Sequence, residues 1–236
     1  MTRGWEKENR PEIVEILGVK VTSSRLDRVI GILKEKLTKK IYEGPFFVVT
    51  VNTEFVMLAQ EDEDFMRILN SADLAVADGA GLKLAGVKNV VPGRSLVGEL
   101  LKLKLRTFYL GGRNGVAEAM ARKYGGEWDG GEKSIRAGEH KSISILNKIN
   151  KYKPDLLLVA YGAPWQEKWI YRHLTELKVK VVMGVGGSFD YLTGRAKVPP
   201  EWISGAGLEW LWRLVHEPWR WRRQLRLARF LLKLAL

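Results

Sequence analysis

Short apolar runs alternate along this chain with amphipathic stretches, and the alternation constrains the fold more than any other feature. The runs are rich in β-branched and aromatic residues, as buried strands are, and span residues 13–17, 46–51, 74–77, 107–110, 156–160 and 179–183. The stretches between them carry charge on one side and Leu, Ile, Val or Met on the other, as in residues 25–38, 55–69, 116–124 and 142–152. Because right-handed crossover helices join successive parallel strands, this order predicts a Rossmann-like α/β domain, with helices on both faces of a mainly parallel sheet.

Length and composition narrow the class of protein. The chain has 236 residues, of which 46% are hydrophobic, so it can bury one substantial core. A formal net charge of +12 favours partners that carry negative charge, such as nucleic acid, phosphorylated ligands or anionic lipid. The chain has no cysteine, and neither its charged N-terminus nor its short uncharged runs match a signal peptide or a spanning helix. We therefore expect a cytoplasmic protein.

The composition changes sharply near Gly194. From Arg195 onward there are nine Lys or Arg against three Glu, and five of the nine tryptophans. We expect a Rossmann-like domain at residues 1–194 and a C-terminal helical, basic appendage at residues 195–236. If Pro218 opens a last helix, its basic face holds Arg222, Arg226, Arg229 and Lys233, and its apolar face holds Trp221, Leu225, Ala228, Leu232 and Ala235. Such a helix is typical of a membrane interface; the alternative is a helix that packs on the domain and exposes a basic face.

Polar side chains follow two of the predicted strands at the point where each strand ends. They are Thr50, Asn52 and Glu54 after one run, and Asp78 and Gly79 after the next. Because the carboxyl ends of parallel strands meet at one edge, where open sheets bind ligands, these side chains should lie together. Asp78 is the best candidate for a general base. In the alternative interpretation, Asp78 and Gly79 only form a tight turn.

Two glycine-rich loops also follow predicted strands and allow backbone amides to approach a diphosphate. Their candidate nucleotide-binding residues are Gly111, Gly112, Gly184 and Gly186. The first loop precedes a helix, where unpaired N–H groups and the helix dipole favour an anion. Neither loop matches the G-x-G-x-x-G dinucleotide fingerprint, and in the alternative interpretation these glycines only permit tight turns.

Other polar residues are weaker candidates. Gln166 begins a helix after a strand and is a candidate for binding a sugar hydroxyl, whereas Glu167 and Lys168 are expected to be solvated charges. Asp62 and Asp64 have the spacing of a D-x-D metal motif, but they lie in a helical acidic run, and the three histidines are far apart. We therefore expect no metal ion and no other cofactor.

Taken together, several segments resemble the WecG/TagA/CpsF family of bacterial glycosyltransferases. They are TVNTE at 50–54, ADGAG at 77–81, PGR at 92–94, YLGG at 109–112, PD at 154–155 with GAPWQE at 162–167, GVGGSFD at 184–190, and GLEWLWR at 207–213 through EP at 217–218. None is decisive alone, but their order along most of the chain is specific.

The resemblance implies a Rossmann-like domain with an appendage that docks on the membrane and helps to complete the active site. It also implies an inverting, metal-independent transfer of a sugar, expected to be N-acetylmannosamine, from a UDP donor to a sugar on undecaprenyl diphosphate. Such an enzyme works in teichoic-acid-like or other surface polysaccharide synthesis. It would be peripheral on the inner face of the cell membrane, and homo-oligomerisation is left open.

Site roles also follow from the resemblance, residue by residue. Asp78 would be the general base, Thr50 and Asn52 would position substrate, and Gln166 would contact the donor. Arg94 would stabilise phosphate charge. From the appendage, the residues approaching the diphosphates would be Arg213, Arg220 and Arg223.

The sequence also departs from the family pattern. Trp165 stands where a small or basic residue is usual, Val198 and Pro199 replace an expected Arg-Ala, and residues 127–140 look shorter and more charged. The donor sugar therefore stays open among N-acetylmannosamine, its uronate, glucose and galactose.

Two other function classes are weaker. A basic nucleic-acid-binding protein would need a recognisable module, which the sequence lacks, so we expect no nucleic-acid partner. An oxidoreductase or methyltransferase would need an acidic ribose-binding residue after the strand that follows the first glycine loop, and no convincing one is present.

Overall fold

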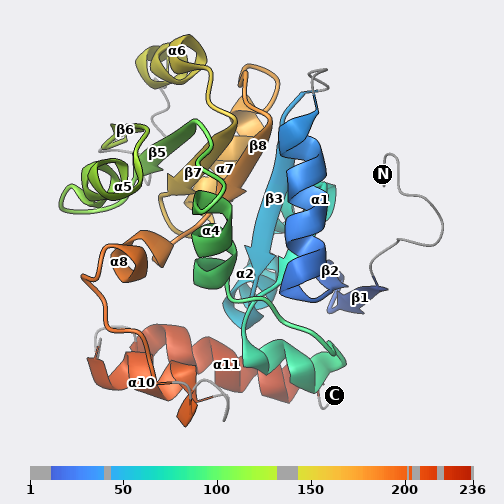
Figure 1. Ribbon diagram of the computed structural model, residues 1–236. Coiled ribbons are helices and arrows are strands. Elements are labelled where there is room, and N and C mark those ends of the chain that lie inside the picture. The colour runs from blue at the N-terminus through green and yellow to red at the C-terminus, as the bar shows by residue number, and fades with distance from the viewer. Residues whose placement is uncertain are drawn as a thin grey trace.

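Eight strands form one sheet at the centre of the molecule (Figure 1), in the order β1-β2-β4-β3-β8-β7-β5-β6. The computed structural model describes residues 12–39, 44–131, 143–200, 202–203, 208–216 and 221–234. The strands are β1 (Glu12–Ile16), β2 (Val19–Ser23), β3 (Phe46–Val51), β4 (Leu74–Ala77), β5 (Thr107–Gly111), β6 (Glu127–Asp129), β7 (Leu156–Ala160) and β8 (Val181–Gly184). All neighbouring strands pair in parallel except β1 with β2, which confirms the predicted mainly parallel sheet.

Helices cover both faces of this sheet. They are α1 (Leu26–Thr38), α2 (Thr53–Glu61), α3 (Glu63–Ser71), the 3₁₀ helix η2 (Ala80–Ala85), α4 (Gly93–Leu101), α5 (Val116–Tyr124), α6 (Ile143–Tyr152), α7 (Trp165–His173), α8 (Ser188–Leu192), α10 (Glu209–His216) and α11 (Trp221–Leu234). One buried cluster lies between the sheet and α2, α3, α6 and α7, and the other between the sheet and α1, α4, α5 and α8. The Rossmann-like layout is thus confirmed.

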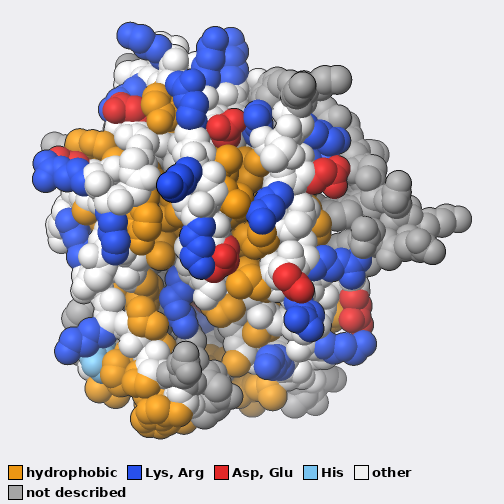
Figure 2. All heavy atoms as spheres, in the orientation of Figure 1, with side chains coloured by type: hydrophobic (Ala, Val, Ile, Leu, Met, Phe, Trp, Pro, Cys, Tyr) orange, Lys and Arg blue, Asp and Glu red, His pale blue; other side chains and the backbone are white. Residues whose placement is uncertain are grey.

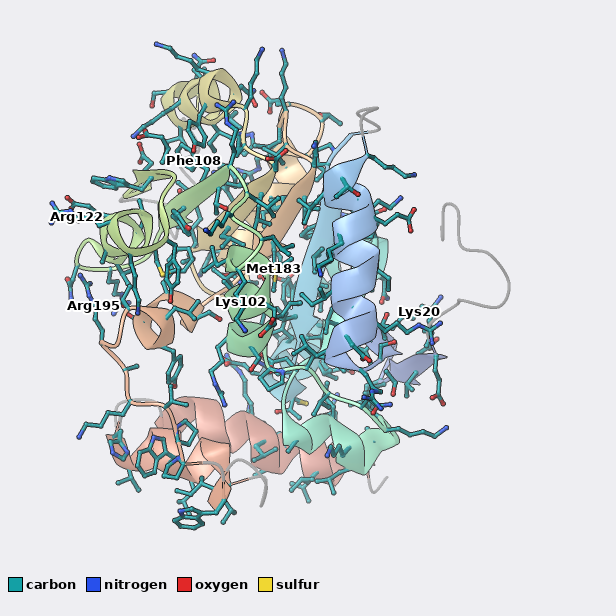
Figure 3. The ribbon with its side chains drawn as sticks, viewed as in Figure 1. Lys20, Lys102, Phe108, Arg122, Met183 and Arg195 are labelled. Atoms are coloured by element: carbon teal, nitrogen blue, oxygen red, sulfur yellow. The ribbon has the colours of Figure 1, made fainter. Side chains whose placement is uncertain are left out.

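The inner strands β3, β4, β5, β7 and β8 are largely apolar because both faces of the sheet are covered there. Side chains of β3 alternate between the two clusters: Phe47 and Val49 belong to the first and Val48 to the second. Met183 of β8, labelled in Figure 3 near the middle of the sheet, also belongs to the second cluster. Because successive side chains of a strand point to opposite faces of the sheet, the position of a residue along the strand determines which layer of helices it contacts.

Three local details differ from the sequence-based expectation. The strands β2 and β6 were not predicted; β2 pairs antiparallel with β1 after a turn in which Leu17 and Gly18 have positive φ. The single helix expected at 55–69 is two helices, because the Asp62 side chain accepts a hydrogen bond from the Phe65 N–H (3.0 Å) and caps α3.

The last helices lie below the carboxyl edge of the sheet, toward which the β3 arrow points in Figure 1. Helix α11 packs on α2, and its Phe230 is 0% exposed within the first buried cluster. Arg226 of α11 forms an ion pair with Glu54 of α2 at 2.9 Å. The C-terminal segment is therefore packed against the edge where α/β sheets bind their ligands.

Candidate active site

The ends of β3 and β4 bring a carboxylate and a hydroxyl together. Thr50 pairs in register with Val76, and the Asp78 N–H continues the ladder by donating to the Val51 carbonyl at 2.7 Å. A Cβ atom added to Gly93 would lie 3.3 Å from Asp78 Oδ2 and 3.5 Å from Thr50 Oγ1. The two side chains therefore converge at the start of α4, as expected for the carboxyl ends of parallel strands.

The dipeptide Asp78-Gly79 is both a turn and part of this cluster. Gly79 has φ +94° and immediately precedes η2, so the turn interpretation is right for its backbone. The half-buried Asp78 side chain nevertheless lies beside Thr50 at the carboxyl edge of the sheet. The turn and the site are thus compatible, and the role of Asp78 as base stays a prediction.

Asn52 and Arg94 border the same edge. The Asn52 side-chain oxygen accepts a hydrogen bond from the Phe55 N–H at 3.1 Å and so caps α2, and its predicted role in positioning substrate stays a prediction. Arg94 lies in the first turn of α4, with its guanidinium carbon 5.9 Å from the ring centre of Tyr191 in α8. Arg94 thus follows Gly93, the residue beside Asp78, and its role in stabilising phosphate charge stays a prediction.

The first glycine-rich loop follows β5. Gly111 and Gly112 have φ of +85° and +81°, and a Cβ at Gly111 would lie 2.7 Å from the ring of Tyr161. The Gly112 N–H donates to the Ala160 carbonyl at 3.0 Å, so it would have to give up that bond to reach a phosphate. Arg195, labelled in Figure 3, donates to the carbonyl of Asn114 at 2.8 Å and ties the following segment to this loop.

The second loop follows β8 and is bound to the start of α7. The Gly186 N–H donates to Gln166 Oε1 at 2.9 Å, and Gly184 is the last residue of the strand. Gln166 is 2% exposed, so its side chain lies below the protein surface. Its contact with the donor stays a prediction. All four candidate glycines and Gln166 lie at the carboxyl edge of the sheet.

The expectation for Glu167 and Lys168 was wrong. Glu167 is 0% exposed, and burial raises its pKa to about 7, although a hydrogen bond from Gln166 acts in the opposite direction. Lys168 is half-buried and pairs with Asp62 at 2.5 Å. The available sequence signal was the apolar pair Trp169 and Ile170, which lies on the same buried face of α7 as Glu167.

The acidic run at 62–64 has local structural roles. Burial alone would raise the pKa of Asp62, but hydrogen bonds from Lys168 and from the Phe65 N–H outweigh it and lower the pKa. Asp64 pairs with Arg67 one turn later in α3. Within the described parts of the chain, no three His, Cys, Asp or Glu side chains gather as a metal site.

The predicted arginines of the C-terminal segment are not placed. Arg220 lies outside the described residues. Arg213 and Arg223 belong to α10 and α11, but their side chains lie outside the described part of the structure. Their approach to the diphosphates therefore stays a prediction.

Exposed apolar side chains gather on α10 and α11 and in the short segment before them. The largest are Trp202, Leu211, Val215, Leu231 and Leu232, the last of them 67% exposed. Figure 2 shows hydrophobic side chains at the lower end of the molecule, the end where α10 and α11 lie in Figure 1. None of the helices in the described ranges is both long and apolar enough to cross a bilayer.

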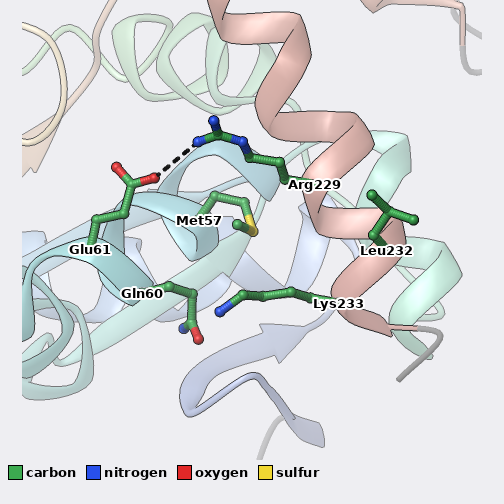
Figure 4. A pocket seen from close by; sticks show the side chains of 6 residues that line it. All are labelled: Met57, Gln60, Glu61, Arg229, Leu232 and Lys233. Atoms are coloured by element: carbon green, nitrogen blue, oxygen red, sulfur yellow. Dashed lines mark ion pairs between the residues drawn. The ribbon is translucent and has the colours of Figure 1, made fainter.

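A hollow lies between α2 and α11 beside these residues (Figure 4). It has a volume of about 300 Å³ and is lined by Met57, Gln60, Glu61, Arg229, Leu232 and Lys233. Arg229 pairs with Glu61 across it at 3.5 Å. The basic residues of α11 thus serve partly to hold that helix on α2.

Comparison with known proteins gives a consistent result. The sequence profile of the family described as "Glycosyl transferase WecG/TagA/CpsF family" matches residues 14–236. The chain is 32% identical over 203 residues to the N-acetylglucosaminyldiphosphoundecaprenol N-acetyl-beta-D-mannosaminyltransferase of Bacillus subtilis (strain 168), covering 78% of this chain and 77% of the relative. It is 28% identical over 238 residues to the protein of the same name from Staphylococcus aureus (strain MRSA252), covering 92% and 89%.

Proposed function

Because the chain belongs to the WecG/TagA/CpsF family and is a glycosyltransferase, we propose that it transfers N-acetylmannosamine from a UDP donor to N-acetylglucosaminyl-diphosphoundecaprenol. The two relatives named above carry this sugar and this acceptor in their names. The reaction would serve teichoic-acid-like or other surface polysaccharide synthesis.

One observation supports the chemistry above all others: the Asp78 carboxylate and the Thr50 hydroxyl converge beside Gly93, one residue before Arg94. In the proposed reaction Asp78 takes the proton from the acceptor hydroxyl, whose oxygen attacks the anomeric carbon of the donor. The bond from that carbon to the diphosphate breaks, and UDP leaves with the electron pair. Attack opposite to the leaving group inverts the anomeric configuration.

The leaving diphosphate requires positive charge. Arg94 supplies it at the first turn of α4, where the helix dipole adds in the same direction. Arg213, Arg220 and Arg223 are proposed to add further charge from the C-terminal segment. In this scheme arginines do the work that a divalent metal ion does in other glycosyltransferases.

The acceptor's lipid tail requires the enzyme to work at a membrane. We assign this task to the appendage at residues 195–236, at the inner face of the cell membrane. The exposed apolar residues of α10 and α11, together with the basic residues around them, support this assignment. The burial of Phe230 against α2 implies that the appendage is anchored in the core of the domain and not merely tethered to it.

The experiment that tests the activity measures UDP release with a panel of UDP-sugars and an N-acetylglucosaminyl-diphospholipid acceptor. We expect release with UDP-N-acetylmannosamine only when the acceptor is present. UDP release with UDP-glucose, UDP-galactose or the UDP-linked uronate, but not with UDP-N-acetylmannosamine, would agree with the family but show that the donor sugar is a different one. Absence of release with every donor would contradict the proposal.

The membrane face is tested by flotation with vesicles that contain anionic phosphatidylglycerol. Leu232→Asp puts a charge on an exposed apolar position and should reduce the fraction of protein that floats. Ile143→Asp is the matched control, because Ile143 is 70% exposed on α6 at the opposite end of the molecule in Figure 1. Equal flotation of the two variants would contradict the assigned face.

A further inference from the structure

A buried amide and a buried carboxyl lie side by side at the start of α7. Gln166 Oε1 accepts hydrogen bonds from the Gly162 N–H at 3.1 Å and from the Gly186 N–H at 2.9 Å. Gly162 lies in the loop between β7 and α7, and Gly186 lies in the loop between β8 and α8. One side-chain oxygen therefore joins two loops at the carboxyl edge of the sheet. We refer to these two hydrogen bonds as the Gln166 bridge.

Hydrogen bonds on both sides fix which way the Gln166 amide faces. The last torsion of a glutamine is broad and roughly two-fold, so its oxygen and nitrogen exchange places easily unless neighbours prevent it. Here two N–H donors lie on one side, and on the other Glu167 Oε1 accepts from Gln166 Nε2 at 2.6 Å. In the reversed orientation the NH₂ group would face two N–H groups and leave buried donors without an acceptor.

A contribution to folding stability does not explain why a carboxyl group is buried at position 167. Its Oε2 atom is buried and has no hydrogen-bond partner within the described part of the chain. The neighbouring cation, Lys168, is paired with Asp62. An apolar side chain of similar size would avoid the desolvation of a carboxyl that no cation compensates. A residue that breaks this packing rule is often kept for a functional site.

Gly184 shows how closely the pair is packed. A Cβ atom there would lie 2.6 Å from Glu167 Oε1 and 2.7 Å from Gln166 Nε2, closer than side chains pack. Gly184 ends β8, which lies between β7 and the strand β3 that carries Thr50. The bridged loops therefore adjoin the strand that carries the candidate catalytic edge.

We propose that Glu167 is a positioning residue: it orients the Gln166 amide and thereby fixes the separation of the two loops, residues 161–164 and 185–187, as one wall of the donor site. The proposal rests on the proposed function, because it assigns this wall to the UDP donor. Gln166 then acts through the loops, with its oxygen committed to Gly162 and Gly186.

Two substitutions separate positioning from simple packing. Glu167→Gln keeps an acceptor for Gln166 Nε2, whereas Glu167→Met keeps the volume but removes the acceptor together with the buried carboxyl. We expect the Met variant to melt at or above the wild-type temperature, yet to bind UDP about tenfold more weakly, the effect of one lost hydrogen bond. The Gln variant should bind UDP within about threefold of wild type.

A double-mutant cycle tests whether the two residues act through one bridge. Gln166→Met removes the bridge itself, so adding Glu167→Met to it should weaken UDP binding no further. The matched control is Glu63→Met, the same change at an exposed position in the first turn of α3. Additive losses in the double variant would overturn the proposal.

Amide hydrogen exchange in the ligand-free protein provides the direct readout. We expect the Gly162 and Gly186 amides to exchange about tenfold faster in Glu167→Met, but near the wild-type rate in Glu167→Gln and Glu63→Met. Unchanged exchange at both glycines in the Met variant would overturn the proposal, and so would faster exchange with unchanged UDP affinity. Wild-type protein that fails to bind UDP would refute the proposed donor, while the exchange rates would still decide whether Glu167 holds the bridge.

Discussion

Two carboxyl groups lie at the same edge of the sheet and differ in what can reach them. Asp78, at the end of β4, is half-buried beside the Thr50 hydroxyl. Glu167, behind the ends of β7 and β8, is 0% exposed and contacts a side-chain amide of its own chain. An acceptor hydroxyl can meet only the first. The difference in exposure supports the proposal that Asp78 takes part in the chemistry, while Glu167 is proposed to shape the wall of the donor site.

The largest expected effect comes from Asp78→Asn. Because the amide cannot take a proton from the acceptor, turnover should fall by roughly 10² to 10⁴, while UDP binding and the melting temperature change little. Steady-state UDP release and calorimetric titration with UDP measure the two quantities. Near-normal turnover would remove Asp78 as the base. A lower melting temperature with little loss of turnover in the folded protein would show that Asp78 serves only the turn.

A glycine lies against each carboxyl, so Gly→Ala tests the two regions in the same way. In Gly93→Ala the new Cβ lies 3.3 Å from Asp78 Oδ2, and turnover should fall roughly tenfold through misplacement of the reacting groups. In Gly184→Ala it lies 2.6 Å from Glu167 Oε1, so overpacking should cost about 1 to 3 kcal/mol of stability and weaken UDP binding. Loss of UDP affinity in the first variant, with turnover preserved, would reverse the assignment of the regions.

Stability should depend on pH through Glu167. Burial raises the pKa of its carboxyl from 4.5 to about 7, so the folded state holds the proton more tightly than the unfolded chain. The folded protein therefore loses stability as pH rises from 4.5 to about 7, and the loss is complete above that range. Glu167→Gln cannot ionise, so its stability relative to wild type should increase by about 1 to 3 kcal/mol across this window. Denaturant titrations at both ends of the window measure it, and a constant difference would contradict a buried, raised carboxyl.

The smallest expected effect is that of a chelator. If Asp78 works as a base and arginines stabilise the leaving UDP, excess EDTA should leave the rate of UDP release unchanged. Inhibition by EDTA that Mn²⁺ or Mg²⁺ reverses would instead make a carboxylate at this edge a metal ligand.

The local sequence pattern predicted the strands whose two faces are both covered by helices. The run at 46–51 became β3 with the same bounds, and the placement of Thr50 and Asp78 at neighbouring strand ends followed from the parallel order. β6 was missed because its three residues, Glu127–Asp129, are partly exposed at the sheet edge and carry two acids.

The role of Glu167 was misjudged for a different reason. Its side chain packs against Gly184, and its partner Gln166 accepts a hydrogen bond from Gly186. Both glycines are distant in sequence and lie next to α7 only once the sheet has formed. A charge in the first turn of a helix is usually solvated, and no local pattern shows that a distant glycine leaves room for it. The alternation of strands and helices, and with it a mainly parallel sheet, can be predicted from local pattern, but contacts between loops of different strands cannot.

The stereochemistry of the product tests the account most directly, because a mechanism in which Asp78 acts only as a base implies one displacement at the anomeric carbon. The protein is incubated with UDP-α-N-acetylmannosamine and an N-acetylglucosaminyl-diphospholipid, and the disaccharide is analysed by NMR alongside the UDP released. We predict one UDP per disaccharide and a β-linked N-acetylmannosamine. An α-linked product would contradict the account, since a single attack opposite to the leaving UDP must invert the α configuration of the donor.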